Sequence, residues 1–229
     1  PNIATIFATV RAAAKEKDAE ATFAAEDLNN IDLDSRWLDY TWNWALFTED
    51  LDWRALVNAY PAPRFNVNVG TSPRTVKRLF MDHLFLNVMP SRPEGINGSA
   101  RITDYPQLSQ TLKTCAKLHQ KFLHSFEDGQ LVGDCILSGP CAEARANAYV
   151  LPEKVLVIAL NTSTQARTVT LAFDIAPWLA SPSGQYTVTP YDETGNARPA
   201  RTEAANSWRE TTSNLAPDEF ALFEIVPQK

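Results

Sequence analysis

Two hydrophobic patterns divide this sequence near residue 128. In the first part, short apolar runs of strand length alternate with longer stretches whose apolar residues recur at helical spacing. The short runs predict strands at 21–25, 39–44, 65–69 and 84–89. The longer stretches predict helices at 3–17, 49–60, 72–80 and 104–126. The predicted order is therefore one helix followed by β-β-α-β-α-β-α.

Alternation of strands and helices in the first part favours parallel strands with helices packed over them. A complete (β/α)8 barrel of the TIM type needs about 250 residues. Residues 1–128 are therefore predicted to form half of such a barrel, and they resemble its last four strands. An open doubly wound sheet is the alternative, although the sequence lacks the Gly-rich phosphate loop that would support it.

The second part is predicted to be an antiparallel β-sandwich. Runs of β-favouring residues follow one another at 155–160, 168–173, 185–189, 208–212 and 219–226. Polar turns separate these runs, and regular spacing of this kind is typical of a sandwich. We assign residues 148–229 to the sandwich and residues 129–147 to a linker between the two parts.

The predicted helix at 104–126 is expected to end the first part and to dock on the second. The sequence places Asp104 as its N-cap, with Pro106 in the first turn and Gln107 at the capping-box position. Cys115 and His119 fall on the apolar stripe of this helix. We therefore expect a buried thiol and a core histidine there.

Composition narrows the functional classes. The net charge of −6 and the lack of a basic stripe argue against a nucleic-acid partner, and no apolar run reaches the roughly 18 residues that a membrane span requires. With three histidines and no Cys-x-x-Cys pair, a zinc site is not expected.

Cys135 and Cys141 could be bridged in an oxidising compartment or remain free. The sequence starts at Pro1 without a methionine, and we expect it to be a piece of a longer protein.

Polar residues gather on and after the predicted strands of the first part. In parallel α/β sheets, ligands bind at the C-terminal ends of the strands. The candidate residues at these ends are Glu26, Asp27, Asn43, Trp44, Asn68, Asn87, Arg92 and Glu94. Carboxylates can act as general acid, base or nucleophile, while aromatic and amide side chains can hold a sugar. The set predicts a carbohydrate site that uses no metal ion.

Glu26 is the first candidate for a catalytic carboxylate, and Asp27 is the second. Successive side chains of a strand point to opposite faces, so only one of the two should face the mouth of a barrel. The other would cap a loop or pair with a base such as Arg36. Structural roles stay open for the remaining candidates, because Trp44 could pack in the core and Glu94 could be a solvated loop residue.

Two segments of the sequence resemble parts of a known enzyme family. The eighth strand, its loop and the eighth helix of (β/α)8 glycoside hydrolases are similar to the segment FLNVMPSRPEGING…DYPQLSQTLKTCAKLHQKFLHSFEDG. The C-terminal β-sandwich of these enzymes is similar to the segment YVLPEKVLVIALNTS…VTLAFDI…DEFALFEIV. The resemblance covers nearly the whole chain as architecture. It implies a carbohydrate substrate, hydrolysis of glycosidic bonds by carboxylate acid/base chemistry, and no redox cofactor.

The resemblance also bears on partners. In these families the catalytic pair is commonly divided between the two halves of the barrel, which implies that one essential carboxylate lies outside this chain. Half a barrel leaves the strands at 21–27 and 84–89 with open edges, and open edges recruit partners. We therefore expect pairing with the missing N-terminal half of the barrel, or self-association. The alternative function is a non-catalytic carbohydrate-binding or assembly module.

Overall fold

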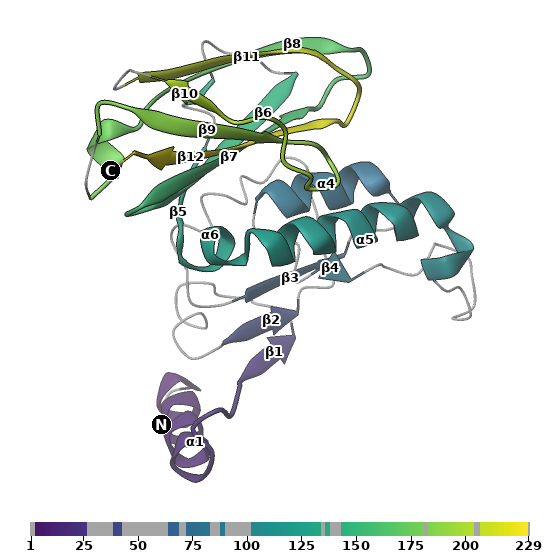
Figure 1. Ribbon diagram of the computed structural model, residues 1–229. Coiled ribbons are helices and arrows are strands. Elements are labelled where there is room, and N and C mark those ends of the chain that lie inside the picture. Colours follow the sequence, from purple (N-terminus) through teal and green to yellow (C-terminus); the bar gives the residue numbers. More distant parts are fainter. Residues whose placement is uncertain are drawn as a thin grey trace.

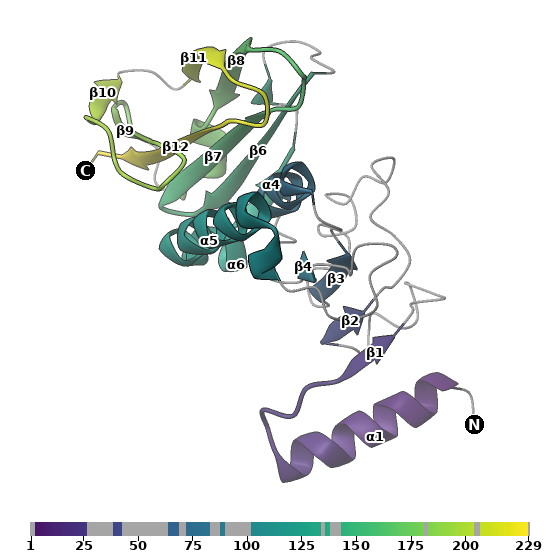
Figure 2. The same ribbon diagram turned by 90° about the vertical axis from the view of Figure 1, so that its right-hand side faces the viewer.

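The structure is layered, with helices between a small parallel sheet and a β-sandwich (Figure 1). This computed structural model describes residues 3–26, 39–42, 64–68, 72–82, 88–89, 102–133, 136–137, 143–180, 183–203 and 207–228. A view turned by 90° shows the same order of layers, with the N-terminal helix beyond the parallel sheet (Figure 2). None of the described helices is both long and apolar enough to cross a membrane.

The parallel sheet contains β1 (Ala24–Glu26), β2 (Tyr40–Trp42), β3 (Arg64–Asn68) and β4 (Val88–Met89). The strands are adjacent in sequence order, and each neighbouring pair is parallel. The predicted parallel arrangement is therefore confirmed, with narrower strand bounds. The described residues do not form a closed barrel, and the helix predicted at 49–60 lies outside them.

Helix α1 (Ile3–Lys17) confirms the first predicted helix, and an ion pair ties it to the sheet. Nη1 of Arg11 donates to Oδ2 of Asp39 at 2.9 Å, and Nη2 of Arg11 donates to the other carboxylate oxygen. Asp39 also accepts a hydrogen bond from the backbone N–H of Phe23 at 3.0 Å. The hydrogen bond from Arg11 is the main reason that the pKa of Asp39 lies below its usual value of 3.8, although burial opposes the shift.

Helix α4 (Pro73–Met81) begins where the sequence predicts. Oγ of Ser72 caps the helix by accepting a hydrogen bond from the backbone N–H of Thr75 at 3.4 Å. A proline occupies the first helical position, where no N–H is needed. The predicted apolar stripe is confirmed, and its three residues are fully buried: Val76, Leu79 and Phe80.

The next helix starts later than predicted. Helix α5 spans Pro106–Lys121, and the predicted N-cap at Asp104 is wrong. Asp104 belongs instead to a 3-10 turn, η2 (Ile102–Asp104), and Tyr105 precedes α5 without a side-chain cap. The first residue of α5 is a proline, which has no N–H, so the start of the helix has one fewer donor that needs a partner.

The helix predicted to run unbroken to residue 126 is interrupted at Phe122. A short helix, α6 (Leu123–Asp128), follows this break. Phe122 leaves the helical dihedral angles (φ −107°, ψ 24°), and its ring meets Tyr191 of the sandwich edge-on at 5.1 Å. Packing against the sandwich thus accompanies a break that helical periodicity does not reveal. The predictions for Cys115 and His119 are confirmed, because the two are only 0% and 4% exposed.

The second part forms two antiparallel sheets, as predicted. The larger has the order β10-β9-β12-β7-β6-β5, and the smaller pairs β11 with β8. The larger sheet contains β5 (Gln130–Val132), β6 (Ala144–Leu151), β7 (Lys154–Asn161), β9 (Tyr186–Tyr191), β10 (Arg201–Glu203) and β12 (Phe220–Pro227). The smaller contains β8 (Arg167–Asp174), which the 3-10 turn η4 (Ala176–Trp178) follows, and β11 (Ser207–Leu215). Strand β5 and the first half of β6 lie within 129–147, so part of the predicted linker is sheet.

Strand β7 is buried on both faces, and its alternating residues enter two different cores. The residues that pack with α4, α5 and α6 are Leu156, Ile158 and Leu160. The residues that pack with β8 and β11 are Val155, Val157 and Ala159. Burial on both faces accounts for the unbroken apolar run VLVIAL. A strand with one solvent-exposed face would instead alternate apolar and polar residues.

A turn between β9 and β10 docks on both long helices of the middle layer. Nζ of Lys77 in α4 donates to Oε1 of Glu193 at 2.9 Å, and Nζ of Lys121 in α5 donates to the carbonyl of Gly195 at 2.6 Å. Gly195 has a φ of +85°, and a Cβ there would lie 3.1 Å from Cδ2 of Leu118. The turn therefore needs glycine for its conformation and for its close approach to α5.

A buried polar cluster holds the C-terminal end of α4 against β6. Asp82 is 1% exposed, and its Oδ2 lies 2.9 Å from Nη2 of Arg145. Nδ2 of Asn147 donates to Oδ1 of Asp82 at 2.9 Å and to the carbonyl of Met81 at 2.7 Å. The hydroxyl of Tyr149 donates to the same carbonyl. Carbonyls at a helix C-terminus lack partners within the helix, so β6 satisfies the end of α4.

Asp82→Asn should lower the free energy of unfolding by about 3 kcal/mol, because it leaves the Arg145 guanidinium without a charged partner at a buried site. Urea denaturation followed by circular dichroism measures this loss. Glu20→Gln makes the same charge change at an exposed side chain and should alter the free energy by less than about 0.5 kcal/mol. Equal losses in the two variants would contradict the role given to Asp82.

The contribution of Asp39 to stability should disappear in acid. A carboxyl group whose pKa is lowered by folding stabilises the folded state above its unfolded-state pKa, and this contribution is lost as the pH falls through the folded-state value. Asp39→Asn should therefore cost about 1 kcal/mol near pH 6 and clearly less near pH 2. Denaturation of both proteins at the two pH values tests this. A cost that does not change with pH would show that the carboxylate charge is irrelevant.

Candidate functional site

Two predicted site residues end strands at the same edge of the parallel sheet. Glu26 is the last residue of β1, and Asn68 is the last residue of β3. In the strand register, Glu26 lies beside Trp42 and Trp42 beside Asn66, while Asn68 lies beside Met89. Adjacent strands are about 4.8 Å apart, so the backbones at Glu26 and Asn66 are separated by roughly 10 Å.

The other predicted site residues lie outside the described part of the chain. They are Asp27, Asn43, Trp44, Asn87, Arg92 and Glu94. In the sequence, Asp27 directly follows β1 and Asn43 directly follows β2. The functional roles of all eight residues remain predictions.

Two of the described strands end in polar residues at this edge. A carboxyl-bearing residue and an amide-bearing residue end strands that lie two positions apart. Glycoside hydrolysis requires two carboxyl groups about 5–9.5 Å apart. At the ends of the four described parallel strands, Glu26 is the only acidic residue. A second carboxyl group would have to come from Asp27 or from a neighbouring segment.

Helix α4 separates this edge from the Asp82 cluster. The helix connects two parallel neighbours, β3 and β4, so it runs in the opposite direction to the strands. Its start at Ser72 therefore lies toward the strand-end edge, and Asp82 lies toward the opposite edge. The polar cluster around Asp82 ties the end of α4 to β6 and lies away from the strand ends.

The buried sulfur and imidazole groups of α5 are unsuited to catalysis. Burial raises the pKa of the Cys115 thiol to about 12, which keeps it protonated and a poor nucleophile. The His119 ring stacks on Phe126 with centroids 4.9 Å apart. Cys135 and Cys141 lie outside the described residues. Within the described ranges, the acidic, histidine and cysteine side chains form no cluster able to hold a metal ion.

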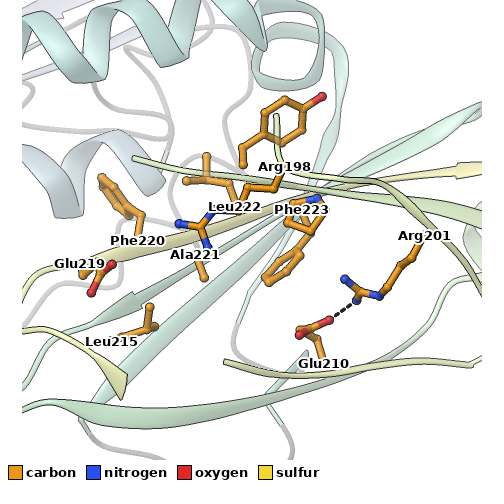
Figure 3. Close-up of a pocket in the computed structure, with 11 residues that line it drawn as sticks. Arg198, Arg201, Glu210, Leu215, Glu219, Phe220, Ala221, Leu222 and Phe223 are labelled. Atoms are coloured by element: carbon orange, nitrogen blue, oxygen red, sulfur yellow. Dashed lines mark hydrogen bonds and ion pairs between the residues drawn. The ribbon is translucent and has the colours of Figure 1, made fainter. Parts of the chain in front are cut away.

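A second candidate site, which sequence reasoning missed, is a cavity of about 290 Å³ in the sandwich (Figure 3). It opens between β12 and β11 and is bounded by the segment that leads into β10. Its charged lining residues are Arg198, Arg201, Glu210 and Glu219. These side chains come from three segments: residues 198–201, strand β11 and the residue before β12. They meet only through the strand pairing, so no local sequence pattern points to the site.

An ion pair occupies one end of this cavity. Nη2 of Arg201 pairs with Oε2 of Glu210, and Nε of Arg201 lies 2.7 Å from Oε1 of Glu203. Burial is the main reason that the pKa of Glu210 is raised, while the positive charge of Arg201 and its hydrogen bond oppose the shift. Arg201 is thus neutralised by two carboxylates.

Comparisons with known proteins show similarity at the level of the fold. No protein family matches the sequence, and neither does any curated protein. Among solved structures, the chain is similar to the noncanonic maltogenic α-amylase AmyB from Thermotoga neapolitana, with a TM-score of 0.58 and 12% identity. It is also similar to an α-amylase from Geobacillus thermoleovorans (TM-score 0.56, 11% identity) and to a β-L-arabinopyranosidase from Geobacillus stearothermophilus (TM-score 0.54, 10% identity).

These matches cover nearly all of this chain and only part of the enzymes. The three alignments span 99–100% of the chain and 55–59% of the respective enzymes. At identities of 10–12% they show a shared fold. The chain is therefore similar in structure to part of several glycoside hydrolases.

Proposed function

We propose that this chain is the C-terminal part of a glycoside hydrolase, in which β1–β4 form half of a (β/α)8 barrel. The order of the elements carries this proposal: parallel strands in sequence order, then docked helices, then an antiparallel sandwich. The fold match to the Thermotoga neapolitana amylase, which covers 99% of the chain, supports it. Such barrels bind substrate at the C-terminal ends of their strands, the edge at which β1 and β3 end in Glu26 and Asn68.

In this proposal Glu26 is one of two carboxyl groups that flank the scissile bond, with Asp27 as the second candidate for that role. One carboxylic acid protonates the departing glycosidic oxygen, and the other carboxylate attacks the anomeric carbon or activates a water molecule. The bond between that carbon and the oxygen breaks, and water supplies the new hydroxyl and restores the proton. No electrons are exchanged, so the reaction needs no redox cofactor.

The remaining predicted residues would hold the sugar. Aromatic rings stack on the C–H faces of pyranoses, while amide, guanidinium and carboxylate groups hydrogen-bond the hydroxyls. The residues proposed for these contacts are Asn43, Trp44, Asn68, Asn87, Arg92 and Glu94. Together they would orient a carbohydrate at the edge where Glu26 ends β1.

We further propose that the missing N-terminal half of the barrel completes this site. Among the described strands, β1 pairs only with β2 and β4 pairs only with β3. Helix α1 also exposes two apolar side chains on one face, since Ile6 is 50% and Val10 is 52% exposed. A second half-barrel would pair with both strand edges and cover this face of α1.

A non-catalytic carbohydrate-binding or assembly module is the second candidate function. It is favoured by the presence of a single acidic residue at the described strand ends and by a separate cavity in the sandwich. In that case the sandwich would bind the sugar, and the parallel sheet would serve as a scaffold.

Glu26→Gln in the full-length protein should lower kcat by about a hundredfold or more, since the amide cannot exchange the proton that the reaction requires. Turnover of an aryl glycoside measures the effect. Glu20→Gln, the same change at an exposed position in the segment before β1, is the matched control and should leave kcat unaltered. Unchanged turnover in Glu26→Gln together with weaker retention on a carbohydrate column would favour the binding module.

The chain alone should self-associate, because no second half-barrel covers its open edges and the apolar face of α1. Light scattering after size exclusion should show dimers or larger species, and Val10→Glu should shift them toward the monomer. Ala12→Glu adds the same charge on the opposite side of α1 and should have little effect. A monomer at high concentration, or equal effects of the two variants, would contradict this surface.

A further inference from the structure

The sandwich cavity lies between the two sheets and has both polar and apolar walls. In Figure 3 the side chain of Arg198 extends across the middle of the cavity, and the Arg201–Glu210 pair lies at one end. Glu219 and Leu215 lie at the other end. The volume of about 290 Å³ is close to the lower limit for small-molecule sites.

Arg198 has unused hydrogen-bonding capacity. The residue is exposed, and its only hydrogen bond to another described residue runs from its backbone N–H to the carbonyl of Pro190 at 2.8 Å. A guanidinium group carries five N–H donors in a fixed plane. All of them are available to a molecule that enters the cavity.

Acceptors lie at both ends of the cavity. Oε2 of Glu219 accepts a hydrogen bond from the backbone N–H of Ala216 at 2.6 Å, which orients this carboxylate and leaves its Oε1 available. Glu210 engages Arg201 through Oε2, and its Oε1 is likewise available. The cavity thus presents donors at its centre and acceptors at both ends.

The charged groups around the cavity do not favour an anion. Two guanidinium groups and two carboxylates line it, and Glu203, which also pairs with Arg201, adds a third carboxylate beside them, so an anion gains nothing from the net field. The walls between these groups include Pro190, Leu215 and Phe223. The Phe223 ring is itself supported by Trp208, whose ring centroid lies 5.3 Å away. Hydroxyl-binding groups around an apolar wall suit the two kinds of surface that a sugar ring offers.

We propose that this cavity is a binding site for a neutral, polyhydroxylated ligand of one or two sugar rings. Arg198 donates to the ring hydroxyls, Glu210 and Glu219 accept from them, and Phe223 contacts the C–H face. The site belongs to the sandwich, whereas the strand-end edge belongs to the parallel sheet on the other side of the helix layer (Figure 1). The inference deepens the second candidate function, on which it rests, by naming the cavity residues and the class of ligand, and it requires no catalytic carboxylate.

An NMR titration of the whole chain with maltose tests this site. Saturable shifts are expected at the backbone amides of Ala221 and Phe223, with a Kd of about 1 mM, as suits a partly open site. Arg198→Ala should weaken binding at least tenfold, and Arg198→Lys should restore part of it, because lysine keeps the charge and three donors. Lys113→Ala removes an exposed cation from α5 and should bind as the wild type does.

Two comparator sugars and one further variant sharpen the result. Glucuronate and glucosamine should bind no more tightly than a neutral monosaccharide. Preferential binding of glucuronate through Arg198 would overturn the neutral-ligand proposal, and so would a lack of saturable shifts at these amides. Equal affinities of Arg198→Ala and Lys113→Ala would do the same. Glu26→Gln should leave this binding unchanged, so a failure of the proposed catalytic function is distinguishable from a failure of this site.

Discussion

Burial of the larger sheet on both faces is the constraint on which the rest of the structure depends. Strand β7 sends one set of side chains toward the helices and the alternate set toward β8 and β11. Each fully buried aliphatic side chain stabilises the fold by about 2 kcal/mol relative to an exposed one. Neither the helix layer nor the smaller sheet could bury its own apolar face without this shared surface. The sheet therefore joins the two parts of the chain into one body.

Apolar packing alone would let the helices slide over the sheet, because hydrophobic contacts are not directional. Polar contacts at several points limit this freedom. Asp82 and its partners fix the end of α4 on β6, while Lys77 reaches Glu193 and Lys121 reaches Gly195 in a single turn. Since α4 lies between β3 and β4 in the chain, these contacts also orient the parallel sheet relative to the sandwich. The stability of the sandwich and the placement of the strand-end edge are thus linked.

The two candidate sites lie in different layers and have different chemistry. The strand-end edge presents Glu26 and Asn68 on strands that need neighbours, so its activity would depend on a partner that completes the barrel. The sandwich cavity is lined entirely by described residues, and two guanidinium groups and two carboxylates are among them. Under the two proposals, carbohydrate binding by the sandwich and hydrolysis at the strand-end edge use separate residues. Binding and hydrolysis would then be separable by mutation.

The sequence by itself determined the element types, since these depend on local periodicity. The stripe at Val76, Leu79 and Phe80, the start of α4 at Ser72 and the buried state of Cys115 all follow from residue spacing. Three features differ from the local pattern because they depend on tertiary packing. The next helix starts after Asp104, it ends at Phe122 before a second short helix, and part of the expected linker belongs to a sheet.

One of the two candidate sites could be predicted from the sequence, and the other could not. The position of Glu26 at a strand end could be predicted, because a strand and its end depend on consecutive residues. The sandwich cavity could not, because Arg198, Glu210 and Glu219 become neighbours only when the strands pair. The roles of Asp39 and Asp82 were hidden for the same reason, since each acts through an arginine far away in the sequence. Local propensity is encoded by neighbours along the chain, whereas sites and ion pairs depend on long-range contacts that only the folded structure defines.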